Sequence, residues 1–402
     1  MKLKIDTVVF DADNIQKNAV IKLKSKHLVN TEEIECKDSV AYSTFINSHE
    51  HLISNWFPRA GKNRPYPNAD IWVEDMKTSE SFLERNKVWL NDGSFTLHKG
   101  NAKLITSLGV YKNIFAGCTI LQDHMPNQED EYYEHFPINV IKDYKQCHTL
   151  SLGNWWGGKS PREEWEDSKD KMPFIIHLGE GVDKNTAKDF EHLLKEDLLQ
   201  PNTILIHGIS LTKADIQKCA EAGTTICWCP ESNLYLIDKT LDVKACLEAG
   251  VNVVIGTDSS MSGSINLIRE IQIAHDIYPT IPIKEIYKMF TSNAQKALFL
   301  DEKYGKLSEK TSNLVLLKKR VDDPMENLMY TKFSSDIQLV VHDGIPIYGD
   351  CKFLINFEHN IDDYFFFNIK GIKKFVIGHP EQICAEISEI LGYHKDFPFL
   401  PF

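Results

Sequence analysis

His177 and Glu180 are placed where a metal ligand and an acid-base group could act together. Residues 174–176 (FII) have the β-branched and aromatic content of a buried strand, and His177 ends that run. Gly179 and Gly181 flank Glu180 and allow the chain to turn there. In parallel α/β proteins the loops that follow the strands converge at one edge, so we expect an imidazole and a carboxylate to emerge together at that edge.

Other histidines recur in the same kind of position. The sequence HEH supplies His49 and His51, which share one face of a strand about 7 Å apart along the chain. His207 and Asp258 close two further apolar runs. Alone, each histidine could be a packing residue; with His177, the set predicts imidazoles and one carboxylate aimed at a common point. Such ligands suit Zn²⁺ or Fe²⁺ better than Mg²⁺ or Ca²⁺.

The elements that must position these residues alternate between strands and helices. Four successive predicted strands end in polar residues at positions 177, 207, 229 and 258, and a stretch of helical length separates each from the next. This spacing is typical of parallel βαβ units. Short alternating segments near both ends of the chain predict antiparallel strands, which favours a small β domain around an inserted barrel. The predicted boundaries are 1–44 and 305–350 for the two parts of the β domain, 45–304 for the barrel, and 351–402 for an α+β extension without a predicted place.

Composition narrows the classes of partner. The formal net charge of -12 argues against nucleic acid and anionic membranes, which require clustered Lys and Arg. No stretch approaches the roughly 18 apolar residues of a membrane span, and the first residues do not resemble a signal peptide. Nine scattered cysteines predict reduced thiols and a cytoplasmic location. A small-molecule substrate is therefore expected.

Five motifs occur in a recognisable order: HxH at 49–51, HxxE at 177–180, LIHG ending at 208, CPESN at 229–233 and GTDS at 256–259. Together they resemble the amidohydrolase superfamily, and within it the single-metal branch with guanine, cytosine and S-adenosylhomocysteine deaminases and triazine hydrolases. Residues 291–300 and 305–317 resemble that branch's last barrel helix and its return to the β domain. The resemblance implies a (β/α)8 TIM-like barrel with a small β-sandwich domain formed from both termini, and a homodimer is possible.

The resemblance also implies roles for individual residues. Glu180 would shuttle protons, and His207 would ligate weakly or hydrogen-bond the attacking water or the substrate. Asp258 would also accept or orient a proton of that water. The implied cofactor is one divalent metal, Zn²⁺ rather than Fe²⁺, which lowers the pKa of a water molecule toward neutrality. Its implied ligands are His49, His51, His177 and Asp258.

A single metal is favoured because binuclear relatives use a carboxylated lysine at the end of the fourth strand. Lys142 and Lys145 lie near that zone, but neither ends a clear strand. Four further residues are candidates for substrate contact, with a purely structural role as the alternative for each. They are His124, His148, Asn233 and Trp56. The segment 155–158 (WWGG) resembles a loop over the barrel mouth.

These observations predict a metal-dependent hydrolase that acts on non-peptide carbon–nitrogen bonds. Deamination of a small nitrogen heterocycle or amidine is the first hypothesis. Hydrolysis of a cyclic amide, or dehalogenation, on the same site is the alternative, because specificity resides in loops. A non-catalytic barrel used for binding or assembly is a third hypothesis, but such barrels typically lose the ligands that are all present here.

Overall fold

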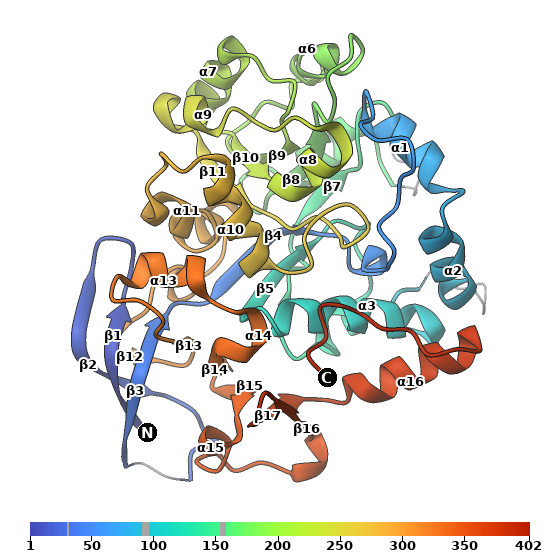
Figure 1. The fold of residues 1–402 in the computed structure, drawn as a ribbon. Helices are drawn as coiled ribbons and strands as arrows, with labels where there is room; N and C mark the ends of the chain where they lie inside the picture. Colours follow the sequence, from blue (N-terminus) through green and yellow to red (C-terminus); the bar gives the residue numbers. More distant parts are fainter. Residues whose placement is uncertain (30–31, 91–95, 153–157) are drawn as a thin grey trace.

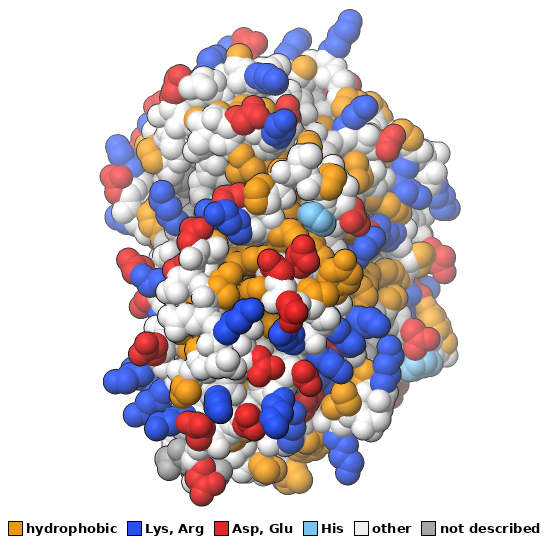
Figure 2. Space-filling view, turned by 60° about the vertical axis from the view of Figure 1, so that its left-hand side comes forward, with side chains coloured by type: hydrophobic (Ala, Val, Ile, Leu, Met, Phe, Trp, Pro, Cys, Tyr) orange, Lys and Arg blue, Asp and Glu red, His pale blue; other side chains and the backbone are white. Residues whose placement is uncertain are grey.

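The computed structural model describes residues 1–29, 32–90, 96–152 and 158–402 of the 402-residue chain. Its upper part in Figure 1 is a set of parallel strands wrapped by helices, and its lower part is a large sheet. Among the described residues, no helix has the length and apolar character needed to cross a membrane. On the face drawn in Figure 2, basic and acidic side chains are interspersed, and apolar side chains gather across the middle.

Eight parallel strands form the upper part, as the resemblance implied. They pair in the order β4-β5-β6 and β7-β8-β9-β10-β11. A bridge between Glu50 and Asp258 brings the end of β11 to the end of β4, whereas no ladder among the described residues joins β6 to β7. The strands are β4 (Phe45–Glu50), β5 (Cys118–Asp123), β6 (Asn139–Val140), β7 (Lys145–Cys147), β8 (Phe174–Leu178), β9 (Thr203–His207), β10 (Thr225–Trp228) and β11 (Asn252–Ile255).

Helices cover the outside of these strands and separate them along the chain. Every residue of β8 and β9 is buried, which explains why parallel strands appear in the sequence as continuous apolar runs. The covering helices have clear end signals: α7 starts with a Thr212–Asp215 capping box and ends at Gly223, whose φ is 70°. The helices are α3 (Gly100–Ile114), α4 (Asp130–Glu134), α5 (Pro161–Ser168), α6 (Asp189–Lys195), α7 (Lys213–Ala222), α8 (Pro230–Ile237), α9 (Val243–Ala249), α10 (Leu267–Ile277), α11 (Ile283–Met289) and α12 (Ser292–Ala297).

The long insertion between β4 and β5 folds back onto the turn after β8. It carries α1 (Ala69–Met76) and α2 (Glu80–Trp89). Asn68 forms a bridge with Gly181, and the Ala69 N–H donates to the Glu180 carbonyl at 2.9 Å. A Cβ at position 181 would lie 2.7 Å from the Pro67 carbonyl oxygen, so this contact requires glycine. The insertion therefore holds the backbone of the predicted proton shuttle.

The lower part is one continuous nine-stranded sheet to which both ends of the chain contribute. Its order is β12-β2-β1-β3-β13-β14-β15-β17-β16. The two faces of the sheet pack against different apolar clusters. Leu3 and Leu339 belong to a cluster on one face, whereas Val40 and Val340 belong to the core that the sheet shares with the barrel. The strands are β1 (Lys2–Val9), β2 (Ile15–Leu23), β3 (Glu33–Tyr42), β12 (Lys310–Thr311), β13 (Leu314–Lys318), β14 (Ile337–His342), β15 (Ile345–Asp350), β16 (Tyr364–Ile369) and β17 (Ile372–Ile377).

The C-terminal extension, which the sequence left unplaced, joins both parts of the molecule. β16 and β17 continue the sheet beyond β15, and α16 (Pro380–Leu391) lies along α3 (Figure 1). Beyond α16, the Lys395 ammonium contacts the Glu84 carboxylate of α2. The extension thus packs against the barrel insertion as well as extending the sheet. Three short helices connect strands of the sheet. α13 (Pro324–Tyr330) and α14 (Phe333–Asp336) lie between β13 and β14, and α15 (Cys351–Leu354) follows β15.

Candidate metal centre

Six imidazoles and a carboxylate gather where the barrel strands end. The rings of neighbouring histidines lie with centroids 4.5 to 6.5 Å apart. The parallel strands explain this, because side chains at their carboxyl ends all meet at the same edge. The gathered residues are His49 and His51 at the end of β4, His124 after β5, His148 after β7, His177 in β8, His207 at the end of β9 and Asp258 after β11.

Four of these side chains have the spacing of a metal site. Ligand nitrogens of His49, His51 and His177 lie within 4.8 Å of one another. Asp258 Oδ1 is 3.7 Å from His49 Nε2 and 3.6 Å from His51 Nε2, which is too long for good hydrogen bonds. Ligands that hold one zinc ion tetrahedrally at about 2.0–2.1 Å are separated by roughly 3.4 Å. The set predicted from the sequence is therefore assembled with room for one ion.

Burial keeps these imidazoles neutral, as metal ligands must be. It lowers the pKa of His49 to about 3, and it also lowers the pKa values of His51 and His177. The neighbouring imidazoles His124 and His148 add to the effect on His177. Each ring consequently has a nitrogen lone pair at neutral pH.

His177 is also oriented by the backbone. Its Nδ1–H donates to the His148 carbonyl oxygen at 2.9 Å, and its own backbone N–H donates to the same oxygen at 3.0 Å. The lone pair of the neutral ring is thereby assigned to Nε2. Metal-binding histidines commonly have such a partner on the ring nitrogen that does not bind the metal.

The ring of His49 is a buried polar group without a hydrogen-bond partner among the described residues. His49 is fully buried, and neither of its ring nitrogens makes a hydrogen bond with the residues that the structure describes. A buried polar group without a partner costs roughly 1–3 kcal/mol. A bound divalent ion would remove this cost, so the residues present fit the cofactor that the resemblance implied.

Asp258 presents a single oxygen to the histidines. Its Oδ2 accepts hydrogen bonds from Ser232 Oγ at 2.7 Å and Ser262 Oγ at 2.6 Å, which leaves Oδ1 toward the imidazoles. Burial alone would raise the pKa of Asp258, but the surrounding imidazoles, His49 first, hold it well below its usual value. The carboxylate is therefore ionised, and its Oδ1 is directed toward the imidazoles.

The backbone is strained at two of the predicted site residues. His207 has φ of 73° and Asp258 has φ of 55°, in the left-handed region that non-glycine residues seldom adopt. Such strain costs on the order of 1–3 kcal/mol and persists where the surrounding structure imposes it, often at active sites. Gly256 allows β11 to approach β4, because a Cβ there would lie 2.5 Å from the Cβ of His49.

His207 and Glu180 form the part of the site suited to proton transfer. The Asn233 Oδ1 accepts a hydrogen bond from His207 Nδ1 at 2.7 Å, so His207 Nε2 faces Glu180 Oε2, 3.5 Å away. Burial, followed by the charges of Asp258 and Asp70, raises the pKa of Glu180 well above its ordinary value. A raised pKa favours the protonated form of a carboxyl group, and that form can act as a general acid.

Two of the predicted substrate contacts have other partners. Trp56 has no exposed surface, its indole N–H donates to Glu84 Oε2 at 2.7 Å, and its ring packs against Phe397. The C-terminal extension and α2 therefore enclose the Trp56 side chain, and a substrate contact at Trp56 stays a prediction. Asn233 is occupied with His207, so its side chain orients an imidazole.

His124 and His148 form a second group with His177. Ligand nitrogens of these three residues also lie within 4.8 Å of one another. Burial lowers the pKa of His148 to about 3 and that of His124 well below its usual value. The sequence placed both residues near the pocket but did not indicate that they share His177 with the first group. Trp155 and Trp156, predicted to cover the barrel mouth, lie outside the described residues.

Sequence reasoning also missed the polar residues behind the histidines. Glu50, the middle residue of HEH, forms a fully buried ion pair with Lys112 of α3, with Nζ 3.0 Å from Oε2. Strand alternation could have directed attention to Glu50, because its side chain must point away from those of His49 and His51. Its partner is distant in the sequence and carries no local signal.

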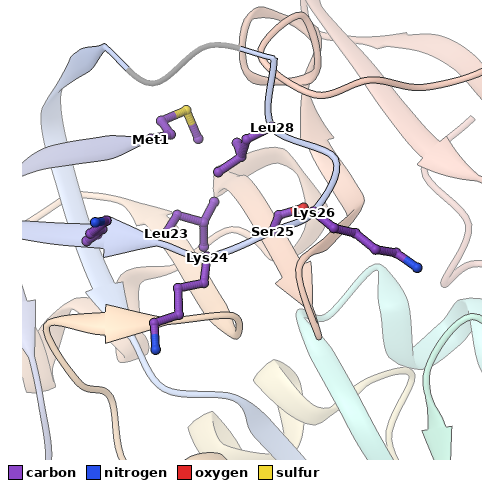
Figure 3. A pocket seen from close by; sticks show the side chains of 7 residues that line it. Met1, Leu23, Lys24, Ser25, Lys26 and Leu28 are labelled. Atoms are coloured by element: carbon purple, nitrogen blue, oxygen red, sulfur yellow. The ribbon is translucent and has the colours of Figure 1, made fainter.

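A cavity elsewhere lacks the groups for this chemistry. It has a volume of about 510 Å³ and lies beside the end of β2 (Figure 3). Among the described residues, three lysines and four others line it, and none of these seven is a histidine, a cysteine or an acidic residue. The lining residues are Met1, Lys22, Leu23, Lys24, Ser25, Lys26 and Leu28.

Comparisons with known proteins agree with this geometry. The model of the amidohydrolase family matches residues 166–346. A 5'-deoxyadenosine deaminase of Methanosphaera stadtmanae is 30% identical over 381 residues, which cover 82% of this chain and 87% of that protein. A 5-methylthioadenosine/S-adenosylhomocysteine deaminase of Pyrococcus abyssi is 30% identical over 385 residues, covering 83% and 88%.

Solved structures share the fold at lower identity. Atrazine chlorohydrolase of Arthrobacter aurescens complexed with zinc superimposes with a TM-score of 0.69 and 17% identity, over 97% of this chain and 99% of that chain. Guanine deaminase of C. acetobutylicum with bound guanine gives a TM-score of 0.61 and 16% identity, over 86% and 99%. These similarities extend over both the barrel and the sheet.

Proposed function

We propose that this chain, which belongs to the amidohydrolase family of hydrolytic enzymes, deaminates a purine-like heterocycle with the help of one zinc ion. The observation that carries the proposal is the position of the Glu180 carboxyl, which is almost enclosed 3.5 Å from His207 Nε2 and lies beside the group of His49, His51, His177 and Asp258. A metal site without an acid could bind a ligand, but cleavage of a C–N bond also requires a proton for the departing nitrogen.

The relatives indicate the substrate class. Those described above are named as deaminases of 5'-deoxyadenosine, methylthioadenosine and S-adenosylhomocysteine. All three compounds carry an adenine ring with an exocyclic amino group. We therefore infer an adenine nucleoside derivative as substrate, with His124 and His148 as candidate contacts to it.

The proposed ligands of the metal are His49, His51, His177 and Asp258, with His207 as a possible further ligand. When bound, a divalent ion lowers the pKa of a water molecule and so supplies a nucleophile near neutral pH. Zinc is favoured over iron by the imidazole-rich donor set and by the fit to tetrahedral spacing.

The ring of His177 supports a count of one ion. Both groups of three histidines need this ring, yet its Nδ1 already donates to the His148 carbonyl, so only Nε2 is available. One nitrogen lone pair serves one ion. Lys142 does not supply a bridging ligand, since its exposed ammonium pairs with Asp130 at 3.3 Å.

Side chains of the protein then carry out the proton transfers. Asp258 Oδ1 is placed to accept a proton from the attacking water. Glu180 gives its proton to the ring nitrogen next to the attacked carbon, then takes the remaining proton of the oxygen that has added to that carbon and passes it to the amino group. The C–N bond breaks, ammonia leaves, and a carbonyl remains. The proton on Asp258 then returns to Glu180 and restores the starting state. His207 Nε2 lies 3.5 Å from Glu180 Oε2, next to the group that transfers these protons.

The remaining assignments follow the same proposal. Residues 45–304 would form the catalytic domain, residues 1–44 and 305–350 the β domain, and residues 351–402 an extension that supports both. A homodimer in the cytoplasm is the proposed state. Substrate is a small molecule, and neither nucleic acid nor membrane takes part.

The test measures ammonia release from protein of known metal content. The panel contains 5'-deoxyadenosine, methylthioadenosine, S-adenosylhomocysteine, adenosine and guanine, with a chlorotriazine scored for chloride and a cyclic amide scored for ring opening. The proposal predicts about one zinc ion per chain and ammonia from an adenine nucleoside. Release of chloride or ring opening without ammonia would move the function to the alternative hydrolase class, and protein without metal would refute the proposal.

A further inference from the structure

A charged pair lies entirely inside the protein, directly behind the proposed metal ligands. Lys112 Nζ of α3 is 3.0 Å from Glu50 Oε2 and 3.2 Å from Glu50 Oε1, and neither side chain has exposed surface. Buried pairs of this kind seldom add stability over apolar residues of the same size, because removing two charges from water is costly. The presence of this pair is therefore better explained by a role other than stabilising the fold.

The Glu50 carboxylate collects donors from four separate segments. Its Oε2 accepts from Thr257 Oγ1 at 2.9 Å, from Asn113 Nδ2 at 3.1 Å and from Asn47 Nδ2 at 3.2 Å. Its Oε1 accepts from Asn55 Nδ2 at 3.2 Å. With Lys112, these side chains come from β4, the turn after β4, α3 and the end of β11. The carboxylate is thus the common point of a fixed polar network.

This network sits immediately next to three of the four proposed ligands. Glu50 lies between His49 and His51 in the sequence, and Thr257 precedes Asp258. The backbones join at the same place, since the N–H groups of Thr257 and Asp258 donate to the His49 carbonyl at 3.0 and 3.1 Å. A shift of Glu50 would consequently change the distance between the two imidazoles on β4 and the carboxylate after β11.

We propose that Glu50 and Lys112 are positioning residues that set the spacing of His49, His51 and Asp258 for the metal. The pair acts through the two strand ends and touches neither metal nor substrate. This inference rests on the proposed metal site, but it concerns how the site is held and does not depend on which compound is deaminated. Outer partners of metal ligands typically contribute about 10- to 100-fold in metal affinity.

The sheet provides a matched control. Lys374 of β17 is fully buried, its Nζ is 2.6 Å from Asp350 Oδ1, and it also donates to the Ile337 carbonyl at 2.6 Å. Lys374→Met therefore removes a buried ammonium from a buried carboxylate, as Lys112→Met does, but in the sheet and away from the histidines. Both variants should lower the melting temperature.

The experiment compares zinc affinity, by competition with a chelator, and the visible absorption spectrum of the cobalt-substituted protein. Lys112→Met should weaken metal binding about 10- to 100-fold and alter the cobalt spectrum, which reports ligand geometry. Thr257→Val removes the hydrogen bond to Glu50 and those that Lys112 and Asn47 donate to the Thr257 hydroxyl, but it leaves the charged pair in place. It should weaken binding about 2- to 10-fold. Lys374→Met should leave affinity and spectrum as in the wild type.

Each outcome bears on the inference. Wild-type affinity and cobalt spectrum in Lys112→Met and Thr257→Val would overturn it, as would an equal loss of affinity in Lys374→Met, which would show that general destabilisation is the cause. If Lys112→Met does not fold, Thr257→Val decides. A wild-type protein that binds no metal would refute the proposed function itself. Metal affinity that is unchanged when Lys112 or Thr257 is substituted would refute only this inference.

Discussion

The strand ends of the barrel and the nine-stranded sheet both bury charged side chains, but the charges have different partners. In the sheet, Lys374 of β17 pairs with Asp350 of the adjacent β15 and donates to the backbone of β14, the next strand beyond, so its partners belong to the sheet. At the barrel ends, Glu50 and Lys112 lie behind the ring of His49, whose nitrogens have no hydrogen-bond partner within the described part of the chain. Buried polar groups that the protein leaves unsatisfied point to a ligand. The comparison therefore separates charges that support folding from charges that support a site.

The strongest test of this distinction removes one imidazole from each region. His177→Ala should reduce zinc affinity by at least about 100-fold, because a ligand is lost from the set. His342→Ala, at a buried histidine of β14, should lower the melting temperature but leave zinc affinity unchanged. Metal analysis after dialysis measures both. Equal metal content in His177→Ala and wild type would show that the barrel histidines are packing residues.

Two glycines, one at the barrel strand ends and one in the sheet, allow the two regions to be compared through the backbone. A Cβ at Gly256 would lie 2.5 Å from the Cβ of His49, so Gly256→Ala should cost about 3 kcal/mol and displace a ligand strand. Gly371, in the β16–β17 hairpin, has φ of 86° and no atom within 4 Å of such a Cβ. Gly371→Ala should cost only about 1 kcal/mol, from backbone strain, without loss of metal. Denaturant unfolding and metal content distinguish the two, and similar effects would contradict the proposed close approach of β11 and β4.

The smallest expected effect concerns pH and a buried acid outside the metal centre. Burial, with the Glu231 carboxylate second, raises the pKa of Glu270 in α10 to about 8. The folded protein then holds a proton that the unfolded chain loses above its ordinary pKa, so stability falls as pH rises from about 4.5 to 8. Between pH 5 and 7.5 the loss should be about 3 kcal/mol.

Glu270→Gln should flatten this dependence, since the amide does not ionise and its oxygen can still accept from the Glu231 N–H, now 2.9 Å away. The exposed Glu386→Gln of α16 serves as a control that keeps the wild-type slope. Denaturant unfolding at several pH values gives the result. A Glu270→Gln protein with the wild-type slope would show that this carboxyl does not remain protonated in the fold.

The sequence could predict which side chains gather at the strand ends, because their signals are local. Apolar runs that end in His177, His207 and Asp258 reveal buried parallel strands, and the topology of such strands brings their ends together. It could not predict the partner of Glu50, because Lys112 lies 62 residues away on a helix. For the same reason the burial of Trp56 beneath Phe397 was missed, since it depends on where the C-terminal extension packs.

The most direct test of the account pairs metal content with turnover in wild type and Glu180→Gln. The glutamine keeps the shape of the side chain but cannot exchange a proton, so general acid-base catalysis worth about 10²- to 10⁴-fold should be lost. The account predicts about one zinc ion per chain in both proteins, and ammonia release from an adenine nucleoside by the wild type alone. Turnover near the wild-type rate in Glu180→Gln, at equal metal content, would contradict it.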